Sequence, residues 1–173
     1  MTHPTRNKTS TEVPFDKKIA DANGNITLPW LQFFGIITDF CNNKIVSWTP
    51  EITASTTAPT ITYSTQSGHY MTIGSLVWVS LVIVVGTVSG GTGDLQLTLP
   101  ITTHDDSDRA RFAILASGVN WGATTQIVAR TNSGTKLATI AAMTTDVEVA
   151  ALAIGAIAAG DTIGLSGFYM RED

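Results

Sequence analysis

The feature that most constrains this chain is a series of short segments between residues 60 and 170 in which apolar and polar residues alternate. Gly68, Gly74, the run 89–93 and similar turn residues separate them at regular intervals. Alternation with a period of two is typical of a strand that buries one face, and many short strands with regular turns are typical of a sandwich or barrel. The expected strands are residues 60–65, 70–73, 76–88, 95–99, 111–115, 125–130, 137–143, 147–149 and 162–170.

The longest apolar run, residues 76–88, is too short for a membrane helix, which needs about 20 residues. It is also rich in β-branched residues, which favour strands. We therefore interpret it as a buried strand and expect no membrane insertion. Residues 148–159 are ambiguous, because alanine favours a helix whereas Gly155 and the surrounding pattern do not. We expect a strand followed by a turn-rich connection there.

One segment has helical spacing, residues 27–41. Thr27 is the expected N-cap, and Pro29 is tolerated in the first turn, where its missing N–H is not needed. Asp39 is the only charged residue, so almost no face of the helix suits water. We expect this helix to pack either against other copies or a partner protein, or over one end of its own β-domain. Its large residues recur every three or four positions: Trp30, Phe33, Phe34, Ile37 and Phe40.

The first 25 residues are polar and lack apolar periodicity, so they cannot bury enough surface to order alone. We expect an extended arm that orders against a partner, with a small hairpin at Asn23-Gly24 between Ile19 and Ile26. The expected organisation is therefore an arm at 1–25, an anchoring helix and linker at 26–47, and a β-domain at 48–173.

Charge is scarce in this chain. Charged residues make up 14% of the 173 residues and apolar ones 43%, whereas about a quarter of a typical soluble domain is charged. This favours a surface covered partly by copies or partners, with a Thr/Ser-coated monomer as the alternative. The net charge of −4 without a basic stripe argues against nucleic acid. A single cysteine, Cys41, and no apolar leader fit assembly in a reducing compartment.

No catalytic, cofactor or metal site is expected. The Gly-rich loop at residues 86–93 runs into a strand instead of the helix that a phosphate-binding loop needs. The three histidines lack metal-ligand spacing, and no Gly-x-Ser-x-Gly nucleophile motif occurs.

Two loops are candidates for contact with a sugar. Asp105, Asp106 and Asp108 follow one another closely, but a solvated loop is favoured over a calcium site because the cluster lacks EF-hand spacing. Asn120 and Trp121 lie in a Gly-rich loop, where an exposed indole stacks on a sugar face, although a buried tryptophan is the more common case. Glycoside hydrolysis needs two carboxylates fixed about 5 to 10 Å apart, which a flexible cluster does not supply.

Several short motifs resemble those of bacteriophage tail and minor structural proteins. They are Trp48-Thr-Pro50, Gly68-x-Tyr70-x-x-Ile-Gly74, Gly93-x-Leu-x-Leu-x-Leu-Pro100, the closing segment 160–169, and the segment 23–34 with its glycine turn, Trp and aromatic pair. Together they span about residues 20 to 170. The terminal domain of those proteins is similar to the trimeric jelly roll of tumour-necrosis-factor and complement globular domains.

The resemblance implies an all-β fold, a jelly-roll-like antiparallel β-sandwich preceded by an extended arm and one short α-helix. It also implies a non-enzymatic, homotrimeric virion protein, made in the bacterial cytoplasm, that binds capsid, portal or tail proteins through the helix residues named above. It would be a short spike or fibre, a tail or head appendage or a capsid decoration protein, because 173 residues leave no room for a repetitive shaft. The outer loops would contact host surface glycans. The alternatives are a small carbohydrate-binding module or a polysaccharide depolymerase.

Overall fold

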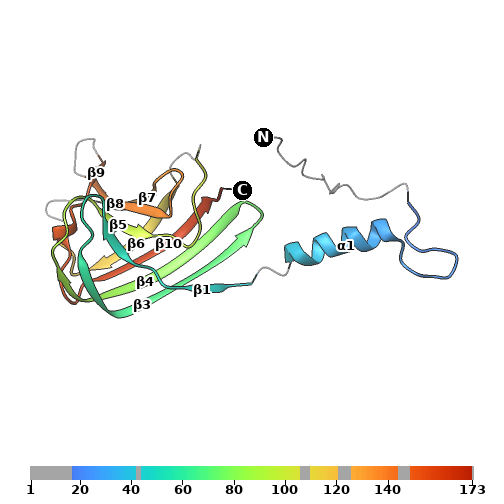
Figure 1. Cartoon of the computed structure of the whole chain (residues 1–173), viewed down its shortest axis with the longest axis horizontal. Coiled ribbons are helices and arrows are strands. Elements are labelled where there is room, and N and C mark those ends of the chain that lie inside the picture. Colours follow the sequence, from blue (N-terminus) through green and yellow to red (C-terminus); the bar gives the residue numbers. More distant parts are fainter. Residues whose placement is uncertain (1–16, 42–43, 106–109, 121–125, 144–148, 173) are drawn as a thin grey trace. The chain divides into compact units, whose positions relative to one another are not determined.

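The computed structural model describes residues 17–41, 44–105, 110–120, 126–143 and 149–172. The chain divides into two compact units, residues 1–43 and 44–173, here called the N-terminal unit and the β-unit. Within these described ranges, the N-terminal unit contains a short hairpin and one helix, α1 (Leu28–Cys41), and the β-unit contains ten strands (Figure 1). No helix in the described ranges combines the length and the apolar character needed to cross a membrane.

The hairpin expected at Asn23-Gly24 is confirmed. Its turn is organised by Asp21, whose Oδ1 accepts hydrogen bonds from the backbone N–H groups of Asn23 (2.8 Å) and Asn25 (2.9 Å). Gly24 has a φ of 83°, a left-handed conformation that favours glycine. Ala20 and Ile26 form the β-bridge that follows the turn. The Asp21 carboxylate therefore adds to the backbone hydrogen bonds between Asp21 and Asn25 and between Gly24 and Asp21 that close the turn.

The helix begins where the sequence predicts. The carbonyl of Thr27 accepts the first helical bonds from the N–H groups of Trp30 and Leu31, so Thr27 takes the N-cap position. Its hydroxyl donates to the Lys18 carbonyl at 2.6 Å, which ties the helix to the hairpin. The Trp30 indole does the same by donating to the Lys17 carbonyl at 3.0 Å. The hairpin and α1 thus form one unit.

The β-unit is a curled, antiparallel, ten-stranded sheet, which confirms the all-β class. Its path runs β1-β3-β4-β10-β6-β7-β8-β5-β2, with β9 also paired to β8. The strands are β1 (Val46–Trp48), β2 (Ile52–Ala54), β3 (Thr60–Ile73), β4 (Leu76–Ser89), β5 (Leu95–Thr98), β6 (Arg111–Ser117), β7 (Gln126–Thr131), β8 (Leu137–Met143), β9 (Val149–Ala151) and β10 (Thr162–Met170), with a 3₁₀ turn, η1 (Ile154–Ala156), before the last strand.

Strand β6 joins the two halves of the curl. Residues 113–117 pair with β10, whereas Arg111 and Phe112 pair with β7. The first half of the sheet is therefore β1-β3-β4-β10-β6, and the second half runs from β6 through β7, β8 and β5 to β2 (Figure 1). A strand that changes partner along its length lets the sheet bend around its core.

The core lies inside the curl, and strict alternation places it there. On β4, five odd-numbered residues from Val77 to Val85 are buried, and on β10 Ile163, Leu165 and Tyr169 are buried. Leu95 and Leu97 of β5 and Ile140 of β8 belong to the same cluster. The opposite positions of β4 and β10 therefore form an outer face.

The expected turn at Gly68 is wrong, because β3 continues through it from Thr60 to Ile73. Gly68 is buried under the indole of Trp48 on the neighbouring strand β1. A Cβ on Gly68 would lie 2.5 Å from the indole Nε1. The glycine is needed for a close approach between strands, which occurs in strand interiors as well as in turns.

Tyr169 is a buried core residue whose hydroxyl is hydrogen-bonded to the backbone of the segment that follows β5. Its hydroxyl donates to the Ile101 carbonyl at 2.9 Å and accepts from the Ile101 N–H at 3.2 Å. Its ring meets Phe112 edge-on, with centroids 6.2 Å apart. Burial raises the pKa of the Tyr169 hydroxyl far above its usual range. Tyr169 thus fixes the connection after β5 against the last strand.

Candidate functional site

The described residues contain no constellation suited to catalysis or metal binding. No group of three or more His, Cys, Asp or Glu side chains in that part of the chain is placed to hold a metal ion. Asp161, the one buried acid among the residues whose burial is described, accepts a hydrogen bond from the Ala158 N–H at 2.7 Å, and its carbonyl accepts the N–H of Val85. Asp161 therefore shapes the turn before β10.

The structure separates the two loops that were predicted to contact sugars. Asp105 lies over Gly134 in the β7–β8 turn, near the start of β6. Asn120 follows the end of β6, where its N–H donates to the Ala156 carbonyl. The seven residues of β6 span about 20 Å, so Asp105 and Asn120 lie at opposite ends of this strand. Asp106, Asp108 and Trp121 lie outside the described residues.

Three of the five predicted anchoring residues form an aromatic cluster on α1. The ring centroids of Trp30, Phe33 and Phe34 lie 5.7 to 5.8 Å apart. Phe34 remains exposed, as do Leu28 and Leu31 on the same helix. Ile37 and Phe40 also belong to α1, but their side chains lie outside the described part. The described part of α1 therefore carries large apolar side chains that are exposed in the single chain.

A second exposed apolar surface covers the outer face of the first half of the sheet. Antiparallel pairing aligns Val82 of β4, Gly164 of β10 and Leu115 of β6 in one row, and it pairs Trp78 with Phe168 in another. The exposed fractions are 80% for Leu115, 53% for Phe168, 46% for Met170 and 44% for Val82. We call this surface the outer apolar face.

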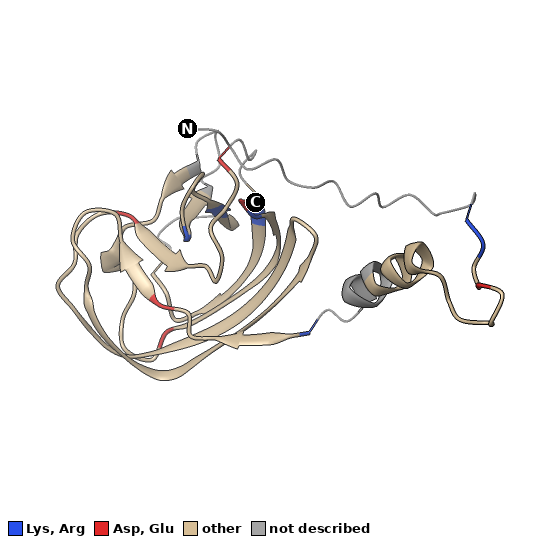
Figure 2. Ribbon diagram, turned by 45° about the vertical axis from the view of Figure 1, so that its right-hand side comes forward, with Lys and Arg blue, Asp and Glu red and all other residues tan. Residues whose placement is uncertain are grey.

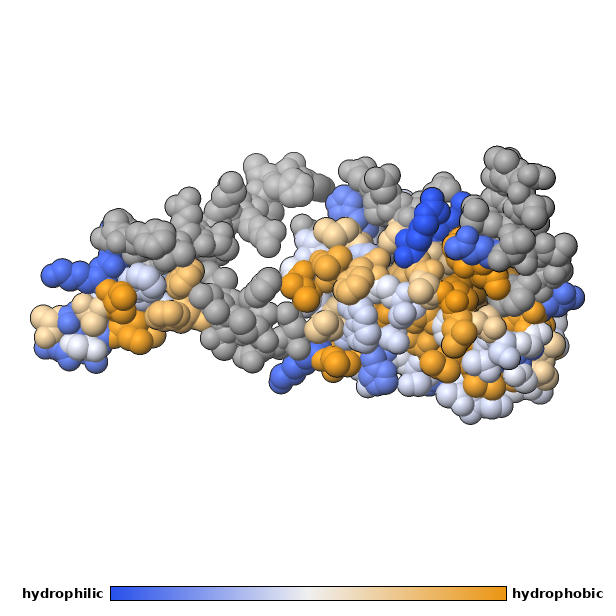
Figure 3. Space-filling view, turned by 180° about the vertical axis from the view of Figure 1, so that it is seen from behind, coloured by the Kyte–Doolittle hydropathy of each residue, from blue (hydrophilic) through white to orange (hydrophobic). Residues whose placement is uncertain are grey.

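The outer apolar face is nearly free of charge. Strands β3, β4 and β10, which are described in full, contain no Asp, Glu, Lys or Arg, and β6 contains only Arg111 (Figure 2). Apolar side chains reach the surface of both units (Figure 3). Because large exposed apolar patches mark interaction sites, this face is a candidate contact with another protein.

Gly164 creates a hollow in the centre of this face. It has no side chain between Val82 and Leu115, and the resulting depression of about 270 Å³ is bordered by Ser80 and Ser166. The exposed side chains of Val82 and Leu115 therefore stand beside a mainly apolar depression that has two serines at its border.

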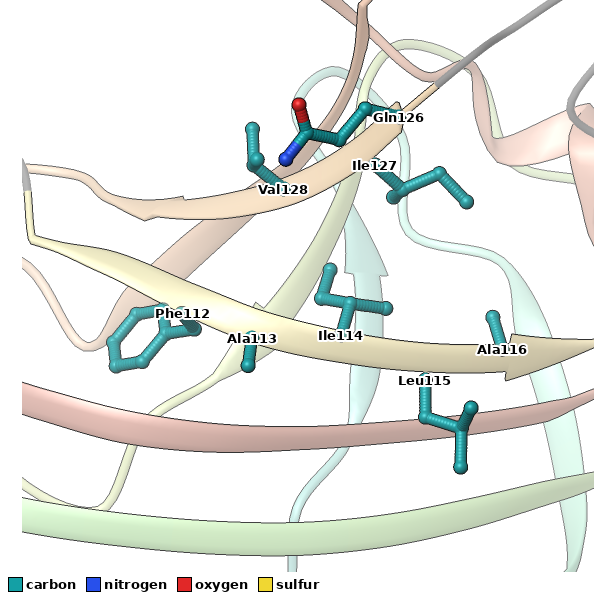
Figure 4. Close-up of a pocket in the computed structure, with 8 residues that line it drawn as sticks. All are labelled: Phe112, Ala113, Ile114, Leu115, Ala116, Gln126, Ile127 and Val128. Carbon is teal, nitrogen blue, oxygen red and sulfur yellow. The ribbon is translucent and has the colours of Figure 1, made fainter.

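A gap opens beside the same face, where β6 and β7 separate. Its volume is about 480 Å³, and residues 112–116 and 126–128 line it. Figure 4 shows the side chains of Ile114 and Ile127 pointing into the gap and Leu115 pointing away from it. We call this gap the β6–β7 seam.

No family model matches the chain, and no curated protein or solved structure was found to be similar to it. The function must therefore be inferred from its surfaces. The sequence singled out α1, but it missed Leu115 and Phe168. The sequence signal for them is a pair of large apolar residues at adjacent positions of a strand, as in Ile114-Leu115 and Phe168-Tyr169. Successive side chains point to opposite faces of a sheet, so only one residue of each pair can face the core.

Proposed function

We propose that this chain is a non-enzymatic structural protein of a bacteriophage virion. It assembles as a homotrimer, attaches to the particle through the N-terminal unit, and projects the β-unit. In this proposal the curled sheet is a jelly-roll-like sandwich, and the partners of α1 are capsid, portal or tail proteins.

The observation that supports this proposal is the exposure of large apolar side chains on both units. Leu28 and Leu31 on α1, and Leu115 and Phe168 on the sheet, all lie more than half exposed. A protein that works as a monomer rarely leaves such surfaces open, because each is an aggregation hazard. Two such surfaces on two units fit a protein with two contacts, one to its own copies and one to the particle.

The outer apolar face is large enough to form part of a subunit contact. Strands β4 and β10 pair over about 30 Å and β6 adds about 20 Å, which at a strand spacing of about 4.8 Å gives a footprint of about 380 Å², and protruding side chains increase the accessible area. A standard interface buries about 800 Å² on each partner. Because the face is almost uncharged, no like-charge repulsion opposes its approach to other copies around a threefold axis. We therefore assign the homotrimer contact to this face.

The helix provides the attachment. Leu28, Leu31 and Phe34 are exposed on a segment whose described part contains no Lys, Arg or Glu. An apolar helix of this kind docks into a hydrophobic groove of its partner. Contact of the outer loops with host glycans stays a prediction, and the separation of Asp105 from Asn120 favours two independent contacts over one combined site.

Light scattering on the full chain and on residues 44–173 tests the proposal. The β-unit has its own hydrophobic core, so we expect the shortened chain to fold and to remain a trimer. A monomer near 18.3 kDa for the full chain and a monomeric shortened chain would overturn the trimer. Particles from a culture that makes this protein should bind an antibody to the β-unit, and particles free of the chain would overturn the virion assignment.

A further inference from the structure

At the β6–β7 seam, part of the backbone of β6 has no partner among the described residues. The N–H of Thr131 donates to the Ala110 carbonyl, which fixes the phase of this antiparallel ladder. Peptide groups that face β7 then belong to every second residue of β6, namely Phe112, Ile114 and Ala116. Phe112 pairs with Ala129 of β7, and this is the last residue of β6 that pairs with β7.

Strand β7 has a matching backbone group without a partner among the described residues. The N–H of Asn132 donates to the Leu137 carbonyl, so the peptide groups of residues 126, 128 and 130 face β8. The Ile127 peptide group consequently faces the seam. Within the described ranges, nothing pairs with the seam-facing N–H and C=O groups of Ile114, Ala116 and Ile127.

These open edges lack the protection that edge strands normally carry. Natural sheets block such edges with lysine, proline or a bulge. Residues 113–117 read Ala-Ile-Leu-Ala-Ser, and residues 126–128 read Gln-Ile-Val. The seam is therefore uncharged on both sides, and its side chains leave a volume of about 480 Å³ open.

We propose that the β6–β7 seam is a strand-acceptor site for an extended, uncharged segment of a different protein. The segment runs antiparallel to β6 and pairs with the peptide groups of Ile114 and Ala116. The stretch 113–117 accommodates about five residues. Successive side chains of the bound segment point to opposite faces of the sheet. Those on one face contact Ile114 and Ile127, and those on the other face point to solvent. Recognition therefore depends on backbone hydrogen bonds and on the absence of charge.

We assign the segment to a different protein, because three segments of this chain fit the seam poorly. The described edge strands β1 and β2 have three residues each, which is shorter than the open stretch of β6. The hairpin that precedes α1 uses its own backbone groups around Asp21. Residues 1–16 carry Arg6, Lys8, Glu12 and Asp16, which do not suit an uncharged seam. This inference does not depend on the trimer proposed above.

Hydrogen exchange on the free protein is the first test. The N–H groups of Ile114, Ala116 and Ile127 should exchange rapidly, whereas those of Ala113 and Leu115, which pair with β10, should be protected. Protection of Ile114 and Ala116 in the dilute protein would mean that the chain already fills its own seam, which would overturn the proposal. Protection that appears only as protein concentration rises would identify a second copy as the occupant and overturn it as well.

Peptide binding is the second test. The probe is the peptide acetyl-Thr-Val-Thr-Val-Thr-amide. Two control peptides have the same sequence. In one, the backbone nitrogens of both valines are methylated, and in the other those of the first and third threonines are methylated. We expect the unmodified peptide to protect Ile114 and Ala116 from exchange. Only the control that loses the N–H groups facing β6 should bind roughly thirtyfold more weakly, about 2 kcal/mol for two hydrogen bonds. Equal binding of all three peptides, or no protection at millimolar concentration, would overturn the proposal.

Discussion

Leu115→Asn is the sharpest perturbation of the proposed trimer. Leu115 is 80% exposed in the single chain, so its replacement removes almost no packing from the folded β-unit. Full burial of a leucine side chain contributes about 1.5 to 3 kcal/mol. If the trimer buries the part that is now exposed, each copy loses about 1.2 to 2.4 kcal/mol, and the trimer loses about 4 to 7 kcal/mol.

This loss is large enough to measure as a shift in assembly. Each 1.4 kcal/mol changes an equilibrium constant tenfold, so the trimer dissociation constant rises by roughly 10³ to 10⁵. The concentration at which half the chains are assembled varies as the square root of that constant. We therefore expect it to rise by roughly 30- to 300-fold. Sedimentation equilibrium over a wide concentration range provides this value.

Ser117→Asn is the matched control, because it places the same residue on the same strand and on the same side of the sheet. Both variants should alter the free energy of unfolding by up to about 1 kcal/mol, the range of strand propensities. Only Leu115→Asn should shift assembly. An unchanged assembly midpoint for Leu115→Asn would refute the assignment of the trimer contact to the outer apolar face.

Three further predictions concern the fold. Tyr169→Phe leaves the N–H and carbonyl of Ile101 without the hydroxyl, and urea titration should show a loss of about 1 to 3 kcal/mol; no loss would show that water replaces it. Gly68→Ala should cost about 1 to 3 kcal/mol in the same assay, because the new Cβ overlaps the Trp48 indole, and an unchanged stability would show that the indole moves aside freely. The pKa of Asp21 lies below its usual value of 3.8 because the Asn25 backbone N–H donates to it, so the turn should keep this stabilisation at neutral pH and lose it as the pH falls below 3.8. Hydrogen exchange at Asn25 should report this loss, and the same pH dependence in Asp21→Asn would contradict it.

The parts of the fold that could be predicted from the sequence are those in which a residue pattern is compatible with a single local structure. Alternation identified the long strand at 76–88, which the structure extends by one residue as β4, and Thr27 marked the start of α1. Gly68 was misinterpreted because glycine serves two purposes, turns and close approaches, and only the neighbouring Trp48 distinguishes them. The strands β1 and β2 are too short for periodicity to be recognised, since three residues contain barely one alternation.

The surfaces of the β-unit were harder to predict than its core. The pair Ile114-Leu115 must place one side chain outside, but the sequence does not indicate which. The buried Phe112 decides it, because even-numbered residues of β6 then face inward. The change of partner after Phe112 also leaves no trace in composition, since the residues of β6 pair with β7 and then with β10 without a proline or a glycine.

Strand β6 therefore carries two proposed contacts that use different parts of the same five residues. Odd positions point their side chains to the outer apolar face, whereas even positions turn their peptide groups to the seam. Leu115→Asn should thus weaken the trimer without altering protection of Ile114 and Ala116 by the threonine–valine peptide. Conversely, excess peptide should leave the mass of the trimer unchanged. If the peptide dissociated the trimer, the two contacts would be one, and the copies would have to meet through the backbone edge of β6 instead of through its side chains.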